Sequence, residues 1–236
     1  MVAKPVDTEL LGARRRLVET LREKGIRDLA VLHAFEMTPR HAFVPTGLRH
    51  RAYEDAALPI GNGQTISQPW VHARYLELLN LKGDERVLEI GFGPGVGIKK
   101  LTERLPRGSV AGIDPSQTMI DMASSRNRRA IAEGKVDLRQ GKVSSLPWPD
   151  ASFDGVLSTN NVQLWETLAS DVKEIARVLA PNGRLAIAVQ TLITPRGTPR
   201  FDGFLLGALR EAGFAEVKVW REWVRFAPYV LARARR

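Results

Sequence analysis

One stretch, VLEIGFGPGVG at residues 87–97, limits what this chain can fold into more than any other. Its apolar beginning predicts a short buried parallel strand, and the acid Glu89 stands at the end of that strand. Glycines then alternate through the following turn, at Gly91, Gly93 and Gly95. Residues 98–105 have the pattern of a helix. Because glycine lacks a Cβ and tolerates positive φ, this order of strand, turn and helix lets a ligand lie against bare backbone.

The spacing of these glycines indicates which ligand to expect. The dinucleotide-binding pattern G-x-G-x-x-G requires glycine at position 96, where this chain has valine. The next predicted strand, residues 109–114, ends in Asp114, and an acid in that position accepts hydrogen bonds from both hydroxyls of a ribose. We therefore predict a nucleoside-type cofactor, with a plain tight turn between strand and helix as the alternative.

Length and composition narrow the class of protein. The 236 residues suffice for one α/β domain and an extension. The chain has no run apolar enough to span a membrane and no apolar signal-peptide core near residue 1, so we expect a cytoplasmic protein. It has no cysteine, and its four histidines lack metal-ligand spacing, so no metal is expected. The net charge of +9 is spread along the chain, which favours solvated helix faces over a nucleic-acid site.

The first 80 residues differ in character from the rest. Residues 7–24 have the apolar periodicity of an amphipathic helix, and Asp28 can cap a second helix. The segment of residues 39–69 is long and rich in turn-forming residues. Loops of this length in a compact domain are usually functional. We expect residues 1–80 to form a helical and loop-rich extension that covers the active site, and residues 81–236 to form the cofactor-binding domain.

Two resemblances follow from these segments. The E-x-G-x-G-x-G spacing resembles motif I of the class I S-adenosylmethionine (SAM) methyltransferases. The segments PRHAFVP, RHRAYEDAALPIG and GQTISQP resemble the N-terminal region of the protein-L-isoaspartate O-methyltransferases, in particular the bacterial form. Enzymes of that family use SAM to methylate the free α-carboxylate of an isoaspartyl residue.

The second resemblance gives the long loop a role. It implies that the TIS segment covers the site and that Thr65 and Ser67 contact the acceptor carboxylate, with Gln64 and Ile66 shaping the pocket. A carboxylate is already a nucleophile at neutral pH, so no general base is required. The alternative is a structural loop in which Ser67 caps the helix that begins at residue 69.

The later half of the chain resembles a different group. IDPSQTMIDMA, VDLRQGKVSSLPWPDASFDGVLSTNNVQLW and EIARVLAPNGRLAIAV are similar to the small-molecule methyltransferases of ubiquinone and menaquinone biosynthesis. In that group an acid after the third strand hydrogen-bonds the adenine amino group, whereas this chain has Lys142 and Val143, so backbone groups or Ser144 must serve there. Asn160 follows the fourth predicted strand at its carboxyl end, where open α/β sheets bind ligands.

These observations predict a doubly wound α/β fold, a mostly parallel, seven-stranded Rossmann-like methyltransferase sheet with a helical N-terminal extension. The candidate acceptor contacts are Gln64, Thr65 and Ser67. The candidate cofactor contacts are Glu89, Gly91, Gly93, Gly95, Asp114, Pro115, Lys142, Val143 and Asn160.

Three functions are open at this point. The first is SAM-dependent methylation of an isoaspartyl-type carboxylate in a peptide or protein, which leaves S-adenosylhomocysteine (SAH). The second keeps the cofactor but places the methyl group on a small molecule. The third is a non-catalytic module that binds SAM or a peptide.

Overall fold

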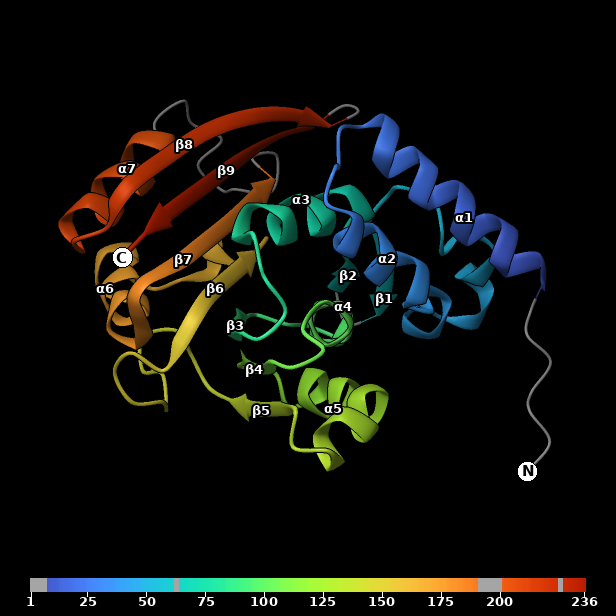
Figure 1. The fold of residues 1–236 in the computed structure, drawn as a ribbon, viewed down its shortest axis with the longest axis horizontal. Coiled ribbons are helices and arrows are strands. Elements are labelled where there is room, and N and C mark those ends of the chain that lie inside the picture. The colour runs from blue at the N-terminus through green and yellow to red at the C-terminus, as the bar shows by residue number, and fades with distance from the viewer. Residues whose placement is uncertain (1–7, 62–63, 191–200, 225–226) are drawn as a thin grey trace.

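The computed structural model describes residues 8–61, 64–190, 201–224 and 227–236 (Figure 1). Its main sheet has seven strands: β3 (Arg86–Ile90), β4 (Ser109–Asp114), β5 (Val136–Gln140), β6 (Phe153–Thr159), β7 (Leu179–Gln190), β8 (Ala215–Val224) and β9 (Ala227–Arg235). They lie in the order β5-β4-β3-β6-β7-β9-β8. The first five of these are mutually parallel, and β9 pairs antiparallel with both β7 and β8. The predicted mostly parallel, seven-stranded sheet is confirmed.

Helices cover both faces of this sheet. They are α3 (Pro69–Leu79), α4 (Val96–Arg104), α5 (Gln117–Ala132), α6 (Leu168–Val178) and α7 (Phe201–Glu211). Neighbouring residues of a strand point to opposite faces, so Val87 belongs to an apolar core with α3 and α4, and Leu88 to a second core with α6 and α7. The sheet is therefore doubly wound, as predicted.

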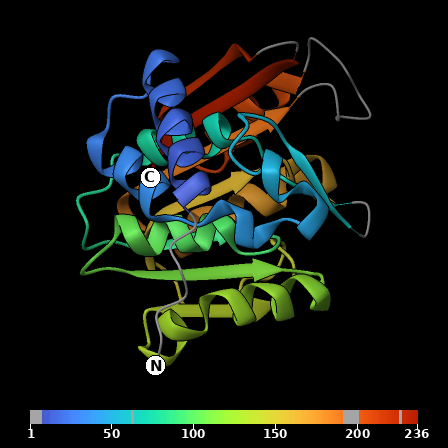
Figure 2. The same cartoon turned by 90° about the vertical axis from the view of Figure 1, so that its right-hand side faces the viewer.

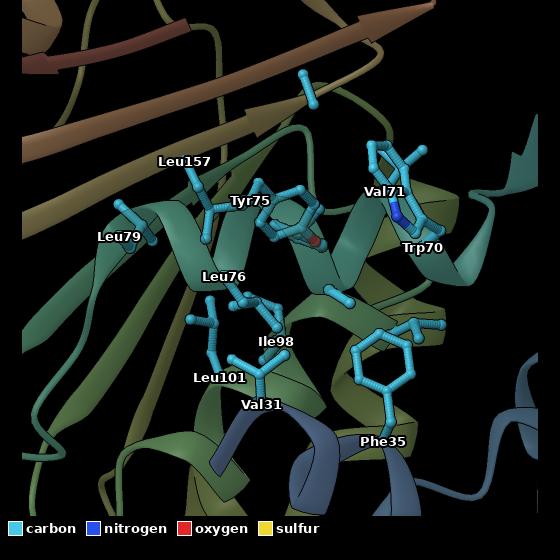
Figure 3. Close-up of a cluster of buried hydrophobic side chains, with 14 of the residues drawn as sticks. Val31, Phe35, Trp70, Val71, Tyr75, Leu76, Leu79, Ile98, Leu101 and Leu157 are labelled. Atoms are coloured by element: carbon cyan, nitrogen blue, oxygen red, sulfur yellow. The ribbon is translucent and has the colours of Figure 1, made fainter. Parts of the chain in front are cut away.

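The N-terminal segment packs on the α3 and α4 face (Figures 1 and 2). It contains α1 (Thr8–Glu23), α2 (Leu29–Met37), the 3-10 turns η1 (Arg40–Phe43) and η2 (Thr46–Arg51), and an antiparallel hairpin of β1 (Leu58–Gly61) and β2 (Gln64–Ile66). Asp28 caps α2 as predicted, since its Oδ1 accepts hydrogen bonds from the backbone N–H groups of Ala30 and Val31. Figure 3 shows Val31 of α2 beside Ile98 and Leu101 of α4, and Phe35 of α2 directed toward the end of α3 that carries Trp70 and Val71. The extension thus shares one apolar core with the sheet.

A buried acid, Asp55, joins three parts of the extension. Its side chain is 6% exposed. Its Oδ1 accepts a hydrogen bond from the backbone N of Trp70 (2.8 Å), and its Oδ2 accepts from Gln68 (3.1 Å) and from the Lys24 ammonium (2.5 Å). The alternative in which Ser67 caps α3 is wrong, because Gln68 is the N-cap and makes no side-chain cap bond. Asp55, from the preceding loop, satisfies a first-turn donor in its place.

We expect Asp55→Ala to lower the free energy of unfolding by about 1 to 3 kcal/mol, because it leaves the buried backbone N–H group of Trp70 and the buried Gln68 amide without their acceptor. Urea denaturation measures this loss. Asp121→Ala is the control, since Asp121 accepts one exposed bond, from Gln117. Equal stability of the two variants would contradict the assignment of Asp55 as the residue that joins these segments.

Candidate active site

The glycine turn is packed at two of its glycines and open at the third. Gly91, Gly93 and Gly95 have φ values of 68°, 53° and 82°, which only glycine adopts readily. A Cβ on Gly91 would lie 1.9 Å from Nδ2 of Asn161, and one on Gly95 would lie 2.7 Å from Nδ2 of Asn127. A Cβ on Gly93 would have nothing within 4 Å. The open face of the turn is therefore at Gly93, and this is where a ligand can approach the backbone.

Asp114 fixes this turn to the end of β4. Its Oδ2 accepts a hydrogen bond from the backbone N of Gly93 (2.9 Å), and its Oδ1 accepts from the backbone N of Ser116 (3.0 Å). Burial raises the pKa of Asp114, and these two backbone bonds oppose the rise. A carboxylate has about four acceptor positions, so two remain for a diol. Pro115 follows at the same edge, and its carbonyl accepts a bond from Gln140 (3.2 Å).

Glu89 of β3 lies on the other side of the turn, and its carboxylate faces Gly97 of α4. It is 4% exposed, and its Oε2 has no hydrogen-bond partner among the described residues. A Cβ at Gly97 would lie 2.0 Å from its Oε1, so glycine at 97 leaves space for the carboxylate. Burial raises the pKa of Glu89 to about 8, Lys100 opposes this shift, and Asp114 adds to it. A buried carboxylate with a free oxygen suits a ligand that brings a cation or a donor.

Of the two residues predicted to lie beside adenine, Lys142 is exposed and Val143 is buried. The Lys142 ammonium forms an exposed ion pair with Glu166 (2.6 Å), which raises its pKa. Val143 is buried in the second apolar core. The backbone N of the preceding Gly141 donates to the Asp114 carbonyl (3.1 Å). Next to Asp114, the residues after β5 therefore present backbone groups and an apolar side chain that an adenine ring could contact.

Two asparagines after β6 have different positions. The side chain of Asn160 accepts a hydrogen bond from the backbone N of Gln190 (2.9 Å) and hydrogen-bonds the Tyr229 hydroxyl. Asn161 instead lies over Gly91 and donates to the Ile90 carbonyl. Asn161 and Asn127 were not among the predicted site residues, because both contact the glycine turn from segments distant in sequence. Sequence position after a strand indicated the neighbourhood but not which of the two asparagines reaches the turn.

The predicted acceptor loop forms the β1–β2 hairpin and the turn into α3. Thr65 is exposed, Ile66 is buried and Ser67 is half-buried, while the side chain of Gln64 lies outside the described residues. Arg40, 2% exposed in η1, donates from its Nη2 to the carbonyl oxygen of Ser67 (2.8 Å). Figures 1 and 2 place this hairpin at the end of the sheet toward which β6 and β7 point, the edge where open α/β sheets bind ligands.

The described residues form neither a metal site nor a membrane-spanning helix. Within the described ranges, no group of three or more His, Asp or Glu residues has the geometry to hold a metal ion. In the same ranges, no helix has the length and hydropathy needed to cross a bilayer. His41 contacts the Tyr53 hydroxyl (2.7 Å), and His72 contacts the Lys100 ammonium (3.0 Å).

Comparison with known proteins identifies a family to which the chain is similar. Residues 13–194 match the family model described as protein-L-isoaspartate(D-aspartate) O-methyltransferase. A protein-L-isoaspartate O-methyltransferase of Alcanivorax borkumensis is 40% identical over 209 residues, which cover 84% of this chain and 93% of that protein. One from Cellvibrio japonicus is 34% identical over 234 residues, which cover 95% and 94%.

Solved structures agree with this comparison. A structure titled protein-L-isoaspartate O-methyltransferase has a TM-score of 0.62 and 25% identity, and the match covers 75% of this chain and 55% of that chain. The [4+2]-cyclase SpnF has a TM-score of 0.61 with 19% identity, over 78% of this chain and 87% of that one. The latter likeness is one of fold alone.

Proposed function

Because the chain belongs to the protein-L-isoaspartate O-methyltransferase family of SAM-dependent methyltransferases, we propose that its acceptor is the free α-carboxylate of an isoaspartyl residue in a peptide or protein. The products are the methyl ester and SAH. The observation that carries this proposal is the acceptor loop at the carboxyl edge of the sheet: a short hairpin with Thr65 and the turn after it with Ser67, whose carbonyl Arg40 holds. No residue need act as a base, because the acceptor is ionised at neutral pH.

The residues around the glycine turn fit SAM. We assign the ribose hydroxyls to Asp114, the cofactor's α-ammonium to the free oxygen of Glu89, and close backbone approach to Gly93. The turn glycines Gly91 and Gly95 and the edge residues Pro115, Lys142, Val143 and Asn160 complete the proposed cofactor side. When bound, SAM supplies a methyl group activated by its sulfonium.

The acceptor loop has to orient and desolvate the carboxylate. Hydroxyl groups of Thr65 and Ser67 and nearby backbone N–H groups are donors that suit a carboxylate, and Gln64 completes the proposed acceptor set. Holding the acceptor oxygen in line with the methyl group is worth about 7 to 11 kcal/mol in well-oriented reactions. The hydrogen bond from Arg40 to the Ser67 carbonyl supports this role, since orienting the acceptor requires a held backbone.

A peptide pair tests the carboxylate as the acceptor. One peptide carries an isoaspartyl residue with a free α-carboxylate, and the other carries the same residue with an α-carboxamide. We expect labelled methyl from SAM on the first peptide alone. Equal labelling of the two peptides would contradict the proposal, because the amide lacks the ionised oxygen.

We expect Ser67→Ala to lower kcat by about 2- to 10-fold, the worth of one hydrogen bond, and to leave the Kd for SAM within about twofold of the parent value. Steady-state kinetics and calorimetry measure the two quantities. Ser152→Ala is the control, since Ser152 lies just before β6 at the opposite edge of the sheet and bonds only locally, to the Pro149 carbonyl. Unchanged kcat for Ser67→Ala would remove Ser67 from the acceptor contacts.

A second candidate, a small-molecule acceptor with the same cofactor, follows only from the resemblance noted in the sequence of residues 136–165, and the family match over residues 13–194 favours the carboxylate. Failure to label either peptide, with SAM binding shown separately, would favour this candidate. We also propose a cytoplasmic location, with which the absence of cysteine in the sequence agrees.

A further inference from the structure

Arginines gather on one face of the main sheet at its amino edge, where the parallel strands begin. Neighbouring residues of a strand point to opposite faces. Ala232 and Ala234 of β9 lie in the second apolar core, so the alternating Arg233 and Arg235 point to the other face. Figure 1 shows this end of β9 at the opposite end of the sheet from the β1–β2 hairpin. The proposed methyl transfer therefore does not use these arginines.

The two strands beside β9 add cations to the same face. Arg184 of β7 is the Cα partner of Arg235, and Lys218 of β8 is the Cα partner of Arg233. Directly opposed residues of an antiparallel pair share a face, with their Cβ atoms about 4.5 to 5.5 Å apart. Like charges in such pairs are destabilising. The sheet therefore carries two unfavourable pairs of cations next to each other.

These pairs border a hollow beyond the end of α3, lined by Leu78, Asn80, Arg184, Glu216, Arg233 and Arg235. The Arg184 guanidinium donates to the carbonyl oxygens of Leu79 (3.0 Å) and Asn80 (2.9 Å), so the end of the helix accounts for this arginine. Arg233 is half-buried, and within the described ranges its guanidinium has no acceptor. Its donors are therefore available to a ligand in the hollow.

A β-bulge keeps the acid of the hollow out of direct pairing with the arginines. If the register between β8 and β9 from Lys218 to Val224 continued, Glu216 would stand opposite Arg235. The register shifts instead, so Ala215 stands there and Glu216 has a φ of 49°, a conformation that is strained for a residue with a Cβ. Glu216 keeps an exposed contact with Arg235 at 3.5 Å. The hollow therefore retains a net positive charge.

Protection of a sheet edge does not account for these arginines. Charged side chains on edge strands commonly prevent pairing with another chain, and this explains Lys218 on β8. The strand β9 lies between β7 and β8, so Arg233 and Arg235 protect no edge. Their guanidinium groups carry planar forks of donors, which bind phosphate or carboxylate groups through two parallel hydrogen bonds.

We propose that Arg233, Arg235 and Lys218 form a binding site for a phosphate group, either free phosphate or the phosphate of a monoester. A phosphate dianion accepts hydrogen bonds from several donors at once and relieves the repulsion between the opposed cations. A carboxylate carries a single charge and neutralises less of this cluster. The site lies at the edge of the sheet opposite the candidate active site, and the proposal does not depend on the identity of the methyl acceptor.

An NMR titration with inorganic phosphate tests the site, at about pH 8, where phosphate is mostly a dianion. Chloride holds the ionic strength constant, because salt screens exposed charges. We expect saturable shifts at the backbone amides of residues 216–218 and 233–235. Arg233→Gln should weaken binding about 10-fold or more. Arg233→Lys keeps the charge but loses the fork of donors, so its affinity should be intermediate.

Two further probes complete the titration. Tighter binding of glycerol phosphate than of inorganic phosphate assigns the site to a monoester, and the reverse order assigns it to the free ion. Acetate tests the need for a dianion. Acetate binding as tight as that of phosphate, or phosphate shifts spread over the whole protein without saturation, would overturn the proposal.

Urea denaturation gives an independent test. Removal of one of two opposed cations should leave the free protein at least as stable, so we expect Arg233→Gln to match or exceed the parent in chloride buffer. Phosphate should stabilise the parent through binding, whereas Arg233→Gln should keep only the general effect of an excluded salt. Arg128→Gln is the matched control, because Arg128 is an exposed arginine of α5, and it should respond to phosphate as the parent does.

Equal stabilisation of the parent and Arg233→Gln by phosphate would overturn the proposal. If Arg233→Gln fails to fold, Lys218→Gln decides, since Lys218 is exposed and its loss should also reduce the response to phosphate.

Discussion

Asp114→Ala is expected to weaken SAM binding by about 1.5 to 3 kcal/mol, roughly 10- to 150-fold, because the ribose hydroxyls lose a charged acceptor. The same change removes the acceptor of the Gly93 and Ser116 backbone N–H groups, so the open part of the glycine turn loses its anchor to β4. Calorimetric titration with SAM measures the loss.

Asp114→Asn separates charge from geometry in this experiment. Asparagine keeps one acceptor oxygen, so we expect an affinity between those of the parent and Asp114→Ala. Asp121→Ala, on the exposed side of α5, is the control for removal of an acid nearby in sequence. An unchanged Kd for SAM in Asp114→Ala would contradict the placement of the ribose.

Gly91→Ala is expected to abolish measurable SAM binding. Its φ of 68° strains any residue with a Cβ by about 1 to 2 kcal/mol, and the new Cβ would lie 1.9 Å from Asn161 Nδ2. Asn161 must then move, and it is the side chain that holds the end of β3 to the segment after β6. We expect SAM affinity to fall by more than about 100-fold, since both the backbone of the glycine turn and the Asn161 side chain that supports it change.

Gly134→Ala is the matched control for the backbone strain. Gly134 has a φ of 71°, close to that of Gly91, but a Cβ there would have no atom within 4 Å. Gly134→Ala reports the backbone strain alone, and Gly91→Ala should lose more stability in urea denaturation because Asn161 must also move. Only Gly91→Ala should lose SAM affinity. Equal SAM affinities in the two variants would contradict the view that the turn at Gly91 forms the cofactor site.

The parts of the site that could be predicted are those whose residues lie together in the sequence. The strand, the glycine turn and the acid at the next strand end follow one another between residues 87 and 114, and local rules of backbone and hydrogen bonding identify them. The helix cap at Asp28 could be predicted for the same reason, because the capping residue and the capped N–H groups are close in sequence. The β1–β2 hairpin was not predicted, because strands of four and three residues are too short to show alternation.

The burial of Lys100 was out of reach for a different reason. Lys99 and Lys100 are adjacent in sequence, and both suggest an exposed helix face. Only the packing of α2 against α4 decides that Lys100 is covered, with Phe35 lying over its ammonium. Phe35 and Lys100 are about 65 residues apart along the chain, so no local sequence pattern predicts their contact. Sequence alone therefore indicated the chemistry of the cofactor side better than the long-range packing around it.

The most direct test of the central claim is methyl transfer from labelled SAM to an isoaspartyl peptide, beside the matched peptide that has an ordinary aspartyl residue. The account predicts base-labile label, the mark of a carboxyl methyl ester, on the isoaspartyl peptide alone. Equal labelling of both peptides, or base-stable label on either, would contradict it.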